Sequence, residues 1–300
     1  MPQKSVLFIV NPISGDIKKS NLPQLIKSNI DEHKFKWEIA YTTHAGHASY
    51  IAKDAVKNNT DIIVAVGGDG SINEIAEAIV NTNVVLAIIP LGSGNGVAYH
   101  LQLPIKNIAK AIQVINTGKI IKIDTLNTNR GIVVGFTGVG FEALVARTYR
   151  HLKRRGFLAY AWATTRGVFY DYKPQQIDFE IDNMSKTATV YSLSIYNAKY
   201  LGYKVGKVGK ASLADGKLNV ILIKKFPLWK VLWVVFLELI GKMHWAKNAE
   251  VFEVEKVKIY LKPKSIIQKD GDSFICSQNY EIKVNPLSLK VIVPLKLEKY

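Results

Sequence analysis

A glycine-rich segment between an apolar run and an amphipathic stretch is the strongest chemical signal in the sequence. It reads Gly67-Gly68-Asp69-Gly70-Ser71-Ile72-Asn73-Glu74. Glycines let a backbone approach a ligand closely, and the free N–H groups of a following helix attract phosphate. Asp69 in such a loop can hold Mg²⁺ or take a proton from an attacking hydroxyl. By itself, the segment is more typical of a tight strand-to-helix turn capped by Ser71 or Asp69.

Three further loops of similar composition favour the chemical interpretation. They read Asn11-Pro12-Ile13-Ser14-Gly15, Thr42-Thr43-His44-Ala45-Gly46 and Pro90-Leu91-Gly92-Ser93-Gly94-Asn95-Gly96-Val97-Ala98, and each follows an apolar run. The carboxyl ends of parallel strands meet at one edge of a sheet, which is where nucleotides bind. None of these loops is a G-x-x-x-x-G-K-[ST] or G-x-G-x-x-G motif, so we expect phosphate binding by a different scheme.

The elements that must position these loops follow from hydrophobic periodicity. Apolar runs predict strands over Lys4–Val10, Trp37–Thr42, Asp61–Val66 and Val84–Ile89, with helical spacing over 22–30 and 72–80 between them. Continuous apolar strands alternating with amphipathic helices favour a parallel sheet covered on both faces. We therefore predict an N-terminal three-layer α/β nucleotide-binding domain over residues 1–123.

From Asp124 the pattern changes to short β-rich runs separated by turn residues. Strands are predicted over 132–136, 177–181, 189–196, 218–223, 257–261, 265–268, 280–284 and 289–294. Two helical inserts are expected at about 141–170 and 227–245. This pattern predicts an antiparallel β-sandwich-like domain over residues 124–286.

Composition and charge narrow the functional classes. The 300 residues are 48% hydrophobic and include one cysteine, Cys276, which excludes a disulfide scaffold and a multi-Cys zinc site. The N-terminal apolar run is too short for a signal peptide, and Lys230 and Glu238 interrupt the best transmembrane candidate. We therefore expect a soluble cytoplasmic protein. Of the net charge of +16, residues 124–300 carry most, with 28 Lys and Arg against 15 Asp and Glu.

In order and spacing, N-P-x-S-G, G-G-D-G-[ST]-x-N-E and P-x-G-[ST]-x-N-x-x-A resemble the diacylglycerol kinase catalytic domain family. That family includes bacterial diacylglycerol kinases and sphingosine and ceramide kinases. Later markers at residues 138–143, 214–219 and 268–272 extend the resemblance over nearly the whole chain. The resemblance implies ATP- and Mg²⁺-dependent phosphorylation of a lipid hydroxyl in a cleft between the domains. It also implies that residues 287–300 return to the first domain.

The resemblance assigns roles to individual residues. For the general base it implies Asp272, where the family has glutamate, or Asp69, as in sphingosine kinases. Metal candidates are Asp69 and Asp215, although Ala214 and Asn219 replace the acids that flank this turn in many bacterial members. By itself, Asp215 is more typical of a turn residue. The cofactor-binding candidates are Asn11, Pro12, Ser14, Gly15, Thr42, Gly67, Gly68, Asp69, Gly70, Ser71, Asn73, Glu74, Gly92, Ser93 and Asn95.

The identity of the substrate stays open. Diacylglycerol or a related lipid is the first expectation, because Leu144, Val145 and Ala146 stand where sphingosine kinases place an acid that binds an amine. Ser93-Gly94-Asn95 has the form found in sphingosine and ceramide kinases, which favours the opposite choice. An NAD kinase shares G-G-D-G, and an inactive basic binding module is the remaining alternative. A homodimer is left open.

The basic half suggests where the protein acts. Five cations fall within nine residues, namely Arg147, Arg150, Lys153, Arg154 and Arg155, and alone they favour a solvated helix face. The apolar segment 227–240 alone favours a core helix. Together with the charge excess, they predict a peripheral contact with an anionic membrane on its inner face, and no nucleic acid partner.

Overall fold

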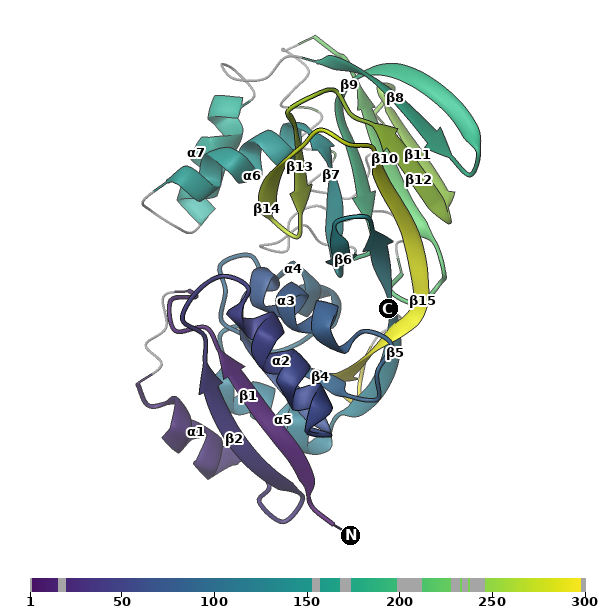
Figure 1. Ribbon diagram of the computed structural model, residues 1–300. Coiled ribbons are helices and arrows are strands. Elements are labelled where there is room, and N and C mark those ends of the chain that lie inside the picture. Colours follow the sequence, from purple (N-terminus) through teal and green to yellow (C-terminus); the bar gives the residue numbers. More distant parts are fainter. Residues whose placement is uncertain are drawn as a thin grey trace. The chain divides into compact units, whose positions relative to one another are not determined.

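The chain forms two compact units. The computed structural model describes residues 2–15, 20–152, 157–167, 174–198, 212–227, 233, 237 and 246–297. The first unit comprises Met1–Asp124 and Pro286–Tyr300, and the second comprises Thr125–Asn285. Two strands, β5 (Lys119–Thr128) and β15 (Tyr280–Val293), run from one unit into the other (Figure 1).

The first unit is built on a parallel sheet in the order β2-β1-β3-β4-β15. Its strands are β1 (Lys4–Val10), β2 (Phe35–Tyr41), β3 (Ile62–Gly67) and β4 (Val85–Pro90). Both β3 and β4 are buried along their whole length, which explains their continuous apolar sequences. The C-terminal part of β15 pairs in parallel with β4, at Lys290 opposite Val85.

Helices cover both faces of this sheet. On one face, α1 (Leu22–Asn29) and α5 (Ile108–Thr117) share an apolar core with β1, β3 and β4. On the other face, α2 (His47–Lys57) packs on β1, and α3 (Asp69–Ile79) packs on β3 and β4 (Figure 1). A short helix, α4 (Gly96–His100), follows β4. The predicted three-layer α/β fold is confirmed.

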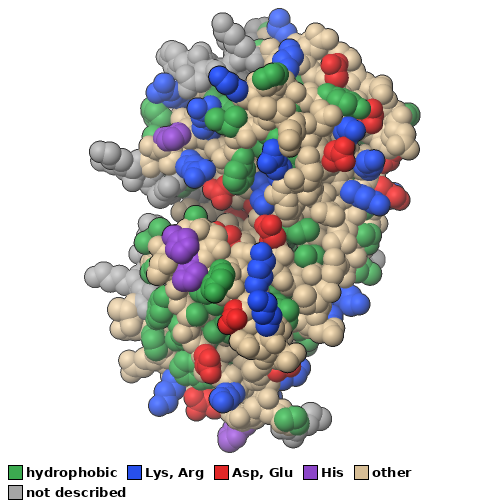
Figure 2. Space-filling model, in the orientation of Figure 1, with side chains coloured by type: hydrophobic (Ala, Val, Ile, Leu, Met, Phe, Trp, Pro, Cys, Tyr) green, Lys and Arg blue, Asp and Glu red, His purple; other side chains and the backbone are tan. Residues whose placement is uncertain are grey.

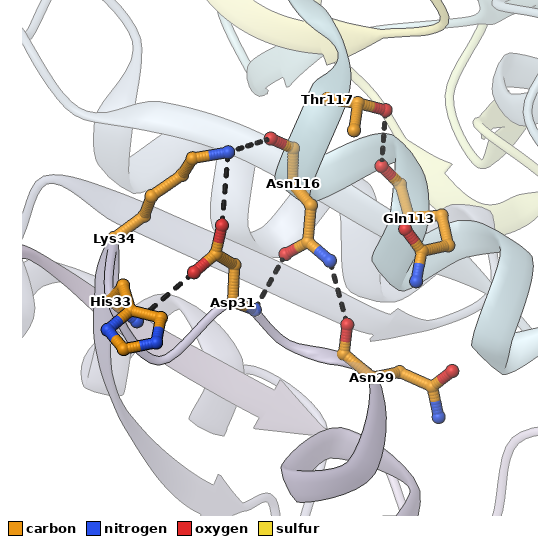
Figure 3. A network of polar contacts seen from close by, with 7 residues as sticks. All are labelled: Asn29, Asp31, His33, Lys34, Gln113, Asn116 and Thr117. Atoms are coloured by element: carbon orange, nitrogen blue, oxygen red, sulfur yellow. Dashed lines mark hydrogen bonds and ion pairs between the residues drawn. The ribbon is translucent and has the colours of Figure 1, made fainter.

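A polar network fastens the loop after α1 to the end of α5 (Figure 3). Asn116 accepts a hydrogen bond from the Asp31 N–H at 3.0 Å and donates to the Asn29 carbonyl at 2.7 Å. Lys34 forms an ion pair with Asp31 at 3.1 Å, and this contact lowers the pKa of the Asp31 carboxyl. The side chain of Asn116 thus satisfies two backbone groups that the end of α1 leaves without helical partners.

The second unit is mostly antiparallel. Its remaining strands are β6 (Gly131–Val133), β7 (Phe136–Gly140), β8 (Gln175–Ile181), β9 (Met184–Tyr196), β10 (Leu218–Lys224), β11 (Ala249–Val254), β12 (Lys256–Tyr260), β13 (Ser265–Lys269) and β14 (Asp272–Cys276). They follow the order β14-β13-β7-β9-β8-β12-β15, with β10 between β9 and β11. One apolar core joins β7–β10, β12, β13 and β15. The predicted antiparallel β-sandwich-like domain is confirmed.

The two inserts expected in this unit have different outcomes. The first contains α6 (Phe141–His151) and α7 (Phe157–Arg166). Helix α6 packs on β7, β9, β13 and β14. The second insert lies almost wholly outside the described residues.

Four predicted strand runs were wrong in their limits, among them the run over 189–196, which lacks the first five residues of β9. The run over 132–136 is divided between β6 and β7, because Asp270 accepts the N–H groups of Val134, Gly135 and Phe136 at 2.8–3.0 Å. The runs over 280–284 and 289–294 form the single strand β15. Within this strand, Leu287 has a φ of 48°, and its N–H donates to the carboxylate of the buried Asp124 at 2.7 Å.

Candidate active site

The loops that follow β1, β3 and β4 lie against one another at the carboxyl edge of the parallel sheet. Asn11 donates from its side-chain amide to the Ser71 hydroxyl at 3.4 Å. Gly15 has a φ of +63°, and a Cβ there would lie 1.8 Å from the Leu91 carbonyl oxygen. Three segments far apart in the sequence therefore form one surface, as parallel topology predicts.

Two glycines allow the second and third of these loops to touch. A Cβ on Gly92 would lie 2.3 Å from the Gly68 Cα, and a Cβ on Gly68 would lie 3.1 Å from the Gly92 Cα. Any larger residue at position 92 must push these backbones apart. The glycines thus bring the amino end of α3, with its free N–H groups, next to the loop that contains Ser93.

Asp69 joins the same two loops through its carboxylate. Its Oδ2 accepts the Gly96 N–H at 3.1 Å, and its Oδ1 accepts the Val97 N–H at 3.3 Å. Asp69 therefore caps α4 while it occupies the first position of α3. Burial raises the pKa of this carboxyl, and the backbone hydrogen bonds oppose that shift.

Two buried side-chain amides belong to the same segments, with Asn73 inside α3 and Asn95 directly before α4. Asn73 is 7% exposed and Asn95 is 1% exposed, and the Oδ1 atom of each has no hydrogen-bond partner in the described part of the chain. Asn95 adopts a left-handed φ of 54° and donates from Nδ2 to the Gly92 carbonyl at 2.8 Å. Carboxylate and amide oxygens suit a hard cation, and helix N–H groups suit its phosphates. These residues therefore fit a nucleotide with Mg²⁺.

Glu74 and Thr42 connect the loop after β2 to this site. Glu74 accepts the N–H groups of Gly46 and Ala48 at 2.9 and 3.2 Å, and so fixes the start of α2. Thr42 is buried and donates its N–H to the Val10 carbonyl at 2.9 Å. Glu74 was predicted to bind the cofactor, and its observed contacts are those of a residue that positions a neighbouring loop.

Asp272, the alternative base, lies in the second unit at the start of β14. It is exposed, and no hydrogen bond or ion pair of its side chain occurs among the described residues. The preceding turn is held by Asp270 and by Gln268, whose Oε1 accepts the Gly271 N–H at 3.2 Å. The carboxylate of Asp272 is thus presented to solvent from a fixed hairpin.

Asp215 makes the contacts of a turn residue. It is exposed, and its Oδ1 accepts the Lys217 N–H at 3.1 Å. No group of three or more His, Cys, Asp or Glu side chains that could hold a metal ion occurs within the described ranges. The metal role of Asp215 stays a prediction.

Three acidic residues that received no role from the motifs are buried or, in the case of Glu142, half-buried. Asp124 and Asp270 accept backbone N–H groups, as described above, and Glu142 lies in the first turn of α6. An acid inside an apolar run, as in Lys122-Ile123-Asp124, was the available signal, since an acid is rarely buried without a partner.

Comparison with known proteins shows which families share this architecture. The parallel α/β unit with its glycine loops and the antiparallel β unit that follows each match a known family model. Residues 5–128 match the family described as diacylglycerol kinase catalytic domain. Residues 135–293 match the family described as YegS C-terminal NAD kinase beta sandwich-like domain. The chain belongs to the diacylglycerol kinase catalytic domain family.

Individual relatives agree with this assignment. The chain is 26% identical to a diacylglycerol kinase of Bacillus subtilis, over 90% of each chain. It is 29% identical to a diacylglycerol kinase of Staphylococcus haemolyticus, over 88% of this chain and 78% of the relative. The crystal structure of a diacylglycerol kinase from Bacillus anthracis superposes with a TM-score of 0.72 at 18% identity, covering 98% of both chains. That superposition supports the fold.

Proposed function

We propose that the protein is an ATP-dependent lipid kinase that transfers the γ-phosphoryl group of Mg-ATP to the hydroxyl of a membrane lipid, with diacylglycerol as the acceptor. The observation that carries this proposal is the contact between the two glycine loops through Asp69, at the amino end of α3. Such a site binds phosphate through backbone N–H groups. Relatives of similar length that are named diacylglycerol kinases support the choice of lipid.

The residues of the first unit hold the nucleotide in this proposal. The N–H groups at the start of α3 and the Ser93 loop bind the phosphates. Asp69 would hold Mg²⁺ together with the side-chain oxygens of Asn73 and Asn95, which have no hydrogen-bond partner among the described residues. When bound, Mg²⁺ neutralises charge on the transferred phosphoryl group. The glycine contact between residues 68 and 92 keeps these groups in place without reorganisation.

Asp272 is the general base in this proposal. The lipid hydroxyl oxygen bonds to the γ-phosphorus while the bond from phosphorus to the β–γ bridging oxygen breaks. The hydroxyl proton passes to a carboxylate. Asp272 is exposed, and its carboxylate has no hydrogen bond or ion pair among the described residues, whereas Asp69 already accepts one N–H group on each oxygen. These contacts favour Asp272 as the base and leave Asp69 to position the metal.

The acceptor requires contact with a bilayer, and we propose a peripheral contact with an anionic membrane on its cytoplasmic face. None of the helices among the described residues is long and apolar enough to cross a membrane. The cationic excess lies beyond residue 123. Figure 2 shows Lys and Arg side chains interspersed with hydrophobic ones over the second unit on the face displayed. Anionic lipid head groups attract a surface that mixes cationic and apolar side chains.

A phosphorylation assay with radiolabelled ATP over a panel of acceptors tests the function. The panel contains 1,2-diacylglycerol, monoacylglycerol, a sphingoid base, ceramide and NAD, each with and without Mg²⁺. We expect labelled phosphatidic acid from diacylglycerol, only with Mg²⁺. Label in NAD alone would contradict a lipid acceptor, and label in the sphingoid base or ceramide alone would replace diacylglycerol as the acceptor.

A further inference from the structure

The second unit buries a group of polar side chains on the face of its sheet that lies under α6. Ser192 and Ser194 alternate along one face of β9, and each is 1% exposed. The carboxyl of Glu142 lies against both hydroxyls, which oppose the rise in its pKa that burial causes. Glu142 Oε2, Ser192 Oγ and Ser194 Oγ have no hydrogen-bond partner in the described residues.

The neighbouring strand places glycines, which have no side chain, opposite these serines. In the register of β7 and β9, Gly138 stands opposite Ser194 and Gly140 stands opposite Ser192. A Cβ on Gly138 would lie 2.4 Å from the Leu193 carbonyl oxygen and 2.8 Å from the Ser194 Cα. No side chain on β7 can therefore partner the two hydroxyls, and α6 with Glu142 is the element placed over them.

Polar groups continue along this face of the sheet. Gln268 on β13 stands opposite Gly138, and Asn219 on β10 stands opposite Tyr196. They are 0% and 3% exposed, and the side-chain nitrogen of each is without a partner in the part of the chain that the structure describes. Buried polar groups without partners cost free energy, so such a concentration needs an explanation. The opposite face of the same strands forms the apolar core. The interior of this unit is therefore not polar in general, and the polar side chains are concentrated on one face of the sheet.

We propose that the cluster of Glu142, Ser192 and Ser194 binds the uncharged, hydroxyl-bearing polar head of the acceptor lipid, an inference that rests on the proposed kinase function. The cluster offers hydrogen-bond donors and an acceptor, and none of its three members is a cation. It therefore suits a neutral head rather than a phosphate. A site whose buried polar groups form hydrogen bonds only with the hydroxyls of its ligand binds an analogue without those hydroxyls much more weakly.

Replacing both serines by alanine tests the cluster. At saturating Mg-ATP, we expect Ser192→Ala/Ser194→Ala to raise the KM for 1,2-dioctanoylglycerol by roughly tenfold, because two hydrogen bonds to the head are lost. The KM for ATP should not change. The melting temperature should equal or exceed that of the parent protein, because two buried hydroxyls without partners are removed. Ser185→Ala, an exposed position on the same strand, is the matched control and should leave all three values unchanged.

Glu142→Gln tests the charge of the head. We expect the variant to raise the KM for dioctanoylglycerol several-fold, with Glu253→Gln at an exposed position of β11 as the control. A loss confined to a sphingoid base would show that the carboxylate pairs with an amine, and would overturn the neutral head. A lower melting temperature with an unchanged lipid KM would show a structural role and would overturn the subsite.

A binding measurement separates this inference from the kinase function. Calorimetric titration of the protein with dioctanoylglycerol, without nucleotide, needs no catalysis. Weaker binding by the double alanine variant would support the subsite even if no lipid were phosphorylated. Equal binding by the parent and the variant would overturn the subsite, even where the parent phosphorylates diacylglycerol.

Discussion

Asp69 occupies both of its carboxylate oxygens with backbone N–H groups of α4, and this arrangement combines a structural and a chemical task. The cap fixes the Ser93 loop relative to α3. The remaining lone pairs of the two oxygens are free for a cation. A residue that both orders a loop and holds a metal is expected to affect stability and turnover together.

Asp69→Asn should lower turnover by about 100-fold or more. An amide carries no negative charge to balance that of the metal, and only its oxygen, not its nitrogen, accepts a hydrogen bond. The amide nitrogen would also face a backbone N–H, so stability should fall by about 1 kcal/mol. Initial rates and thermal melts measure the two effects. Turnover close to that of the parent protein would contradict the metal-positioning role.

Asp272→Ala should lower turnover by roughly 100-fold or more, since a positioned base contributes that much. The side chain is exposed and unpaired in the described structure, so the melting temperature and the affinity for ATP should stay unchanged. Asp272→Glu, which restores the family's residue, is the control and should keep substantial activity. An unchanged rate for Asp272→Ala would remove this residue as the base.

At the scale of elements, the loops after β3 and β4 can touch because Gly92 has no side chain. Gly92→Ala would place a Cβ 2.3 Å from the Gly68 Cα, so the loops must separate. We expect a loss of ATP affinity and of about 1–3 kcal/mol of stability, measured by calorimetry and denaturant unfolding.

Gly216→Ala is the control for this loop prediction. Gly216 has a φ of +70° and open space around it, so alanine there should cost about 1 kcal/mol through backbone strain. Its affinity for ATP should equal that of the parent protein. Equal ATP affinity in Gly92→Ala as well would show that the loop contact is not needed for nucleotide binding.

The network of Asn116 makes a separate prediction about the first unit (Figure 3). Asn116→Ala removes two hydrogen bonds to the backbone groups of residues 29 and 31, so unfolding should require about 1–3 kcal/mol less free energy. Turnover at a temperature below the melting transition should not change. Gln113→Ala, an exposed position on the same helix, should leave stability unchanged, and an equal loss in both variants would contradict the role of the network.

Most elements of the first unit could be predicted from the sequence, because the spacing of apolar residues along a strand or helix indicates directly which positions are buried. The strand limits of β1, β3 and β4 agree with the predicted runs within a residue at each end. Strands β5, β11 (Ala249–Val254) and β14 were missed. β14 alternates buried and exposed positions irregularly, and β5 crosses between the two units. Local sequence carries no information about such long-range pairing.

At the scale of the whole molecule, charge is distributed unequally along the chain. Residues 124–300 hold 28 Lys and Arg against 15 Asp and Glu, whereas the nucleotide loops rely on backbone groups. The excess therefore does not serve ATP binding in our proposal, and an anionic membrane surface is the partner that it suits.

Binding to vesicles that contain anionic lipid should weaken as salt rises from 0.1 to 0.5 M, because salt screens exposed charges. Arg147→Glu, on the exposed side of α6, should reduce co-sedimentation with these vesicles. Lys57→Glu, which changes the charge by the same amount at an exposed position of α2, is the control. This variant should bind the vesicles as strongly as the parent protein does. Binding that is insensitive to salt would contradict an electrostatic contact.

By itself, the sequence determined the two-part architecture, the glycine loops and the family, because these depend on local periodicity and on short ordered motifs. Only the tertiary structure decided what the candidate residues contact. It showed that Asp69 caps α4, that Glu74 fixes α2, and that Glu142 faces two buried serines. These partners are 26 to 52 positions apart in the chain. Their meeting depends on strand order and register, which no short segment encodes.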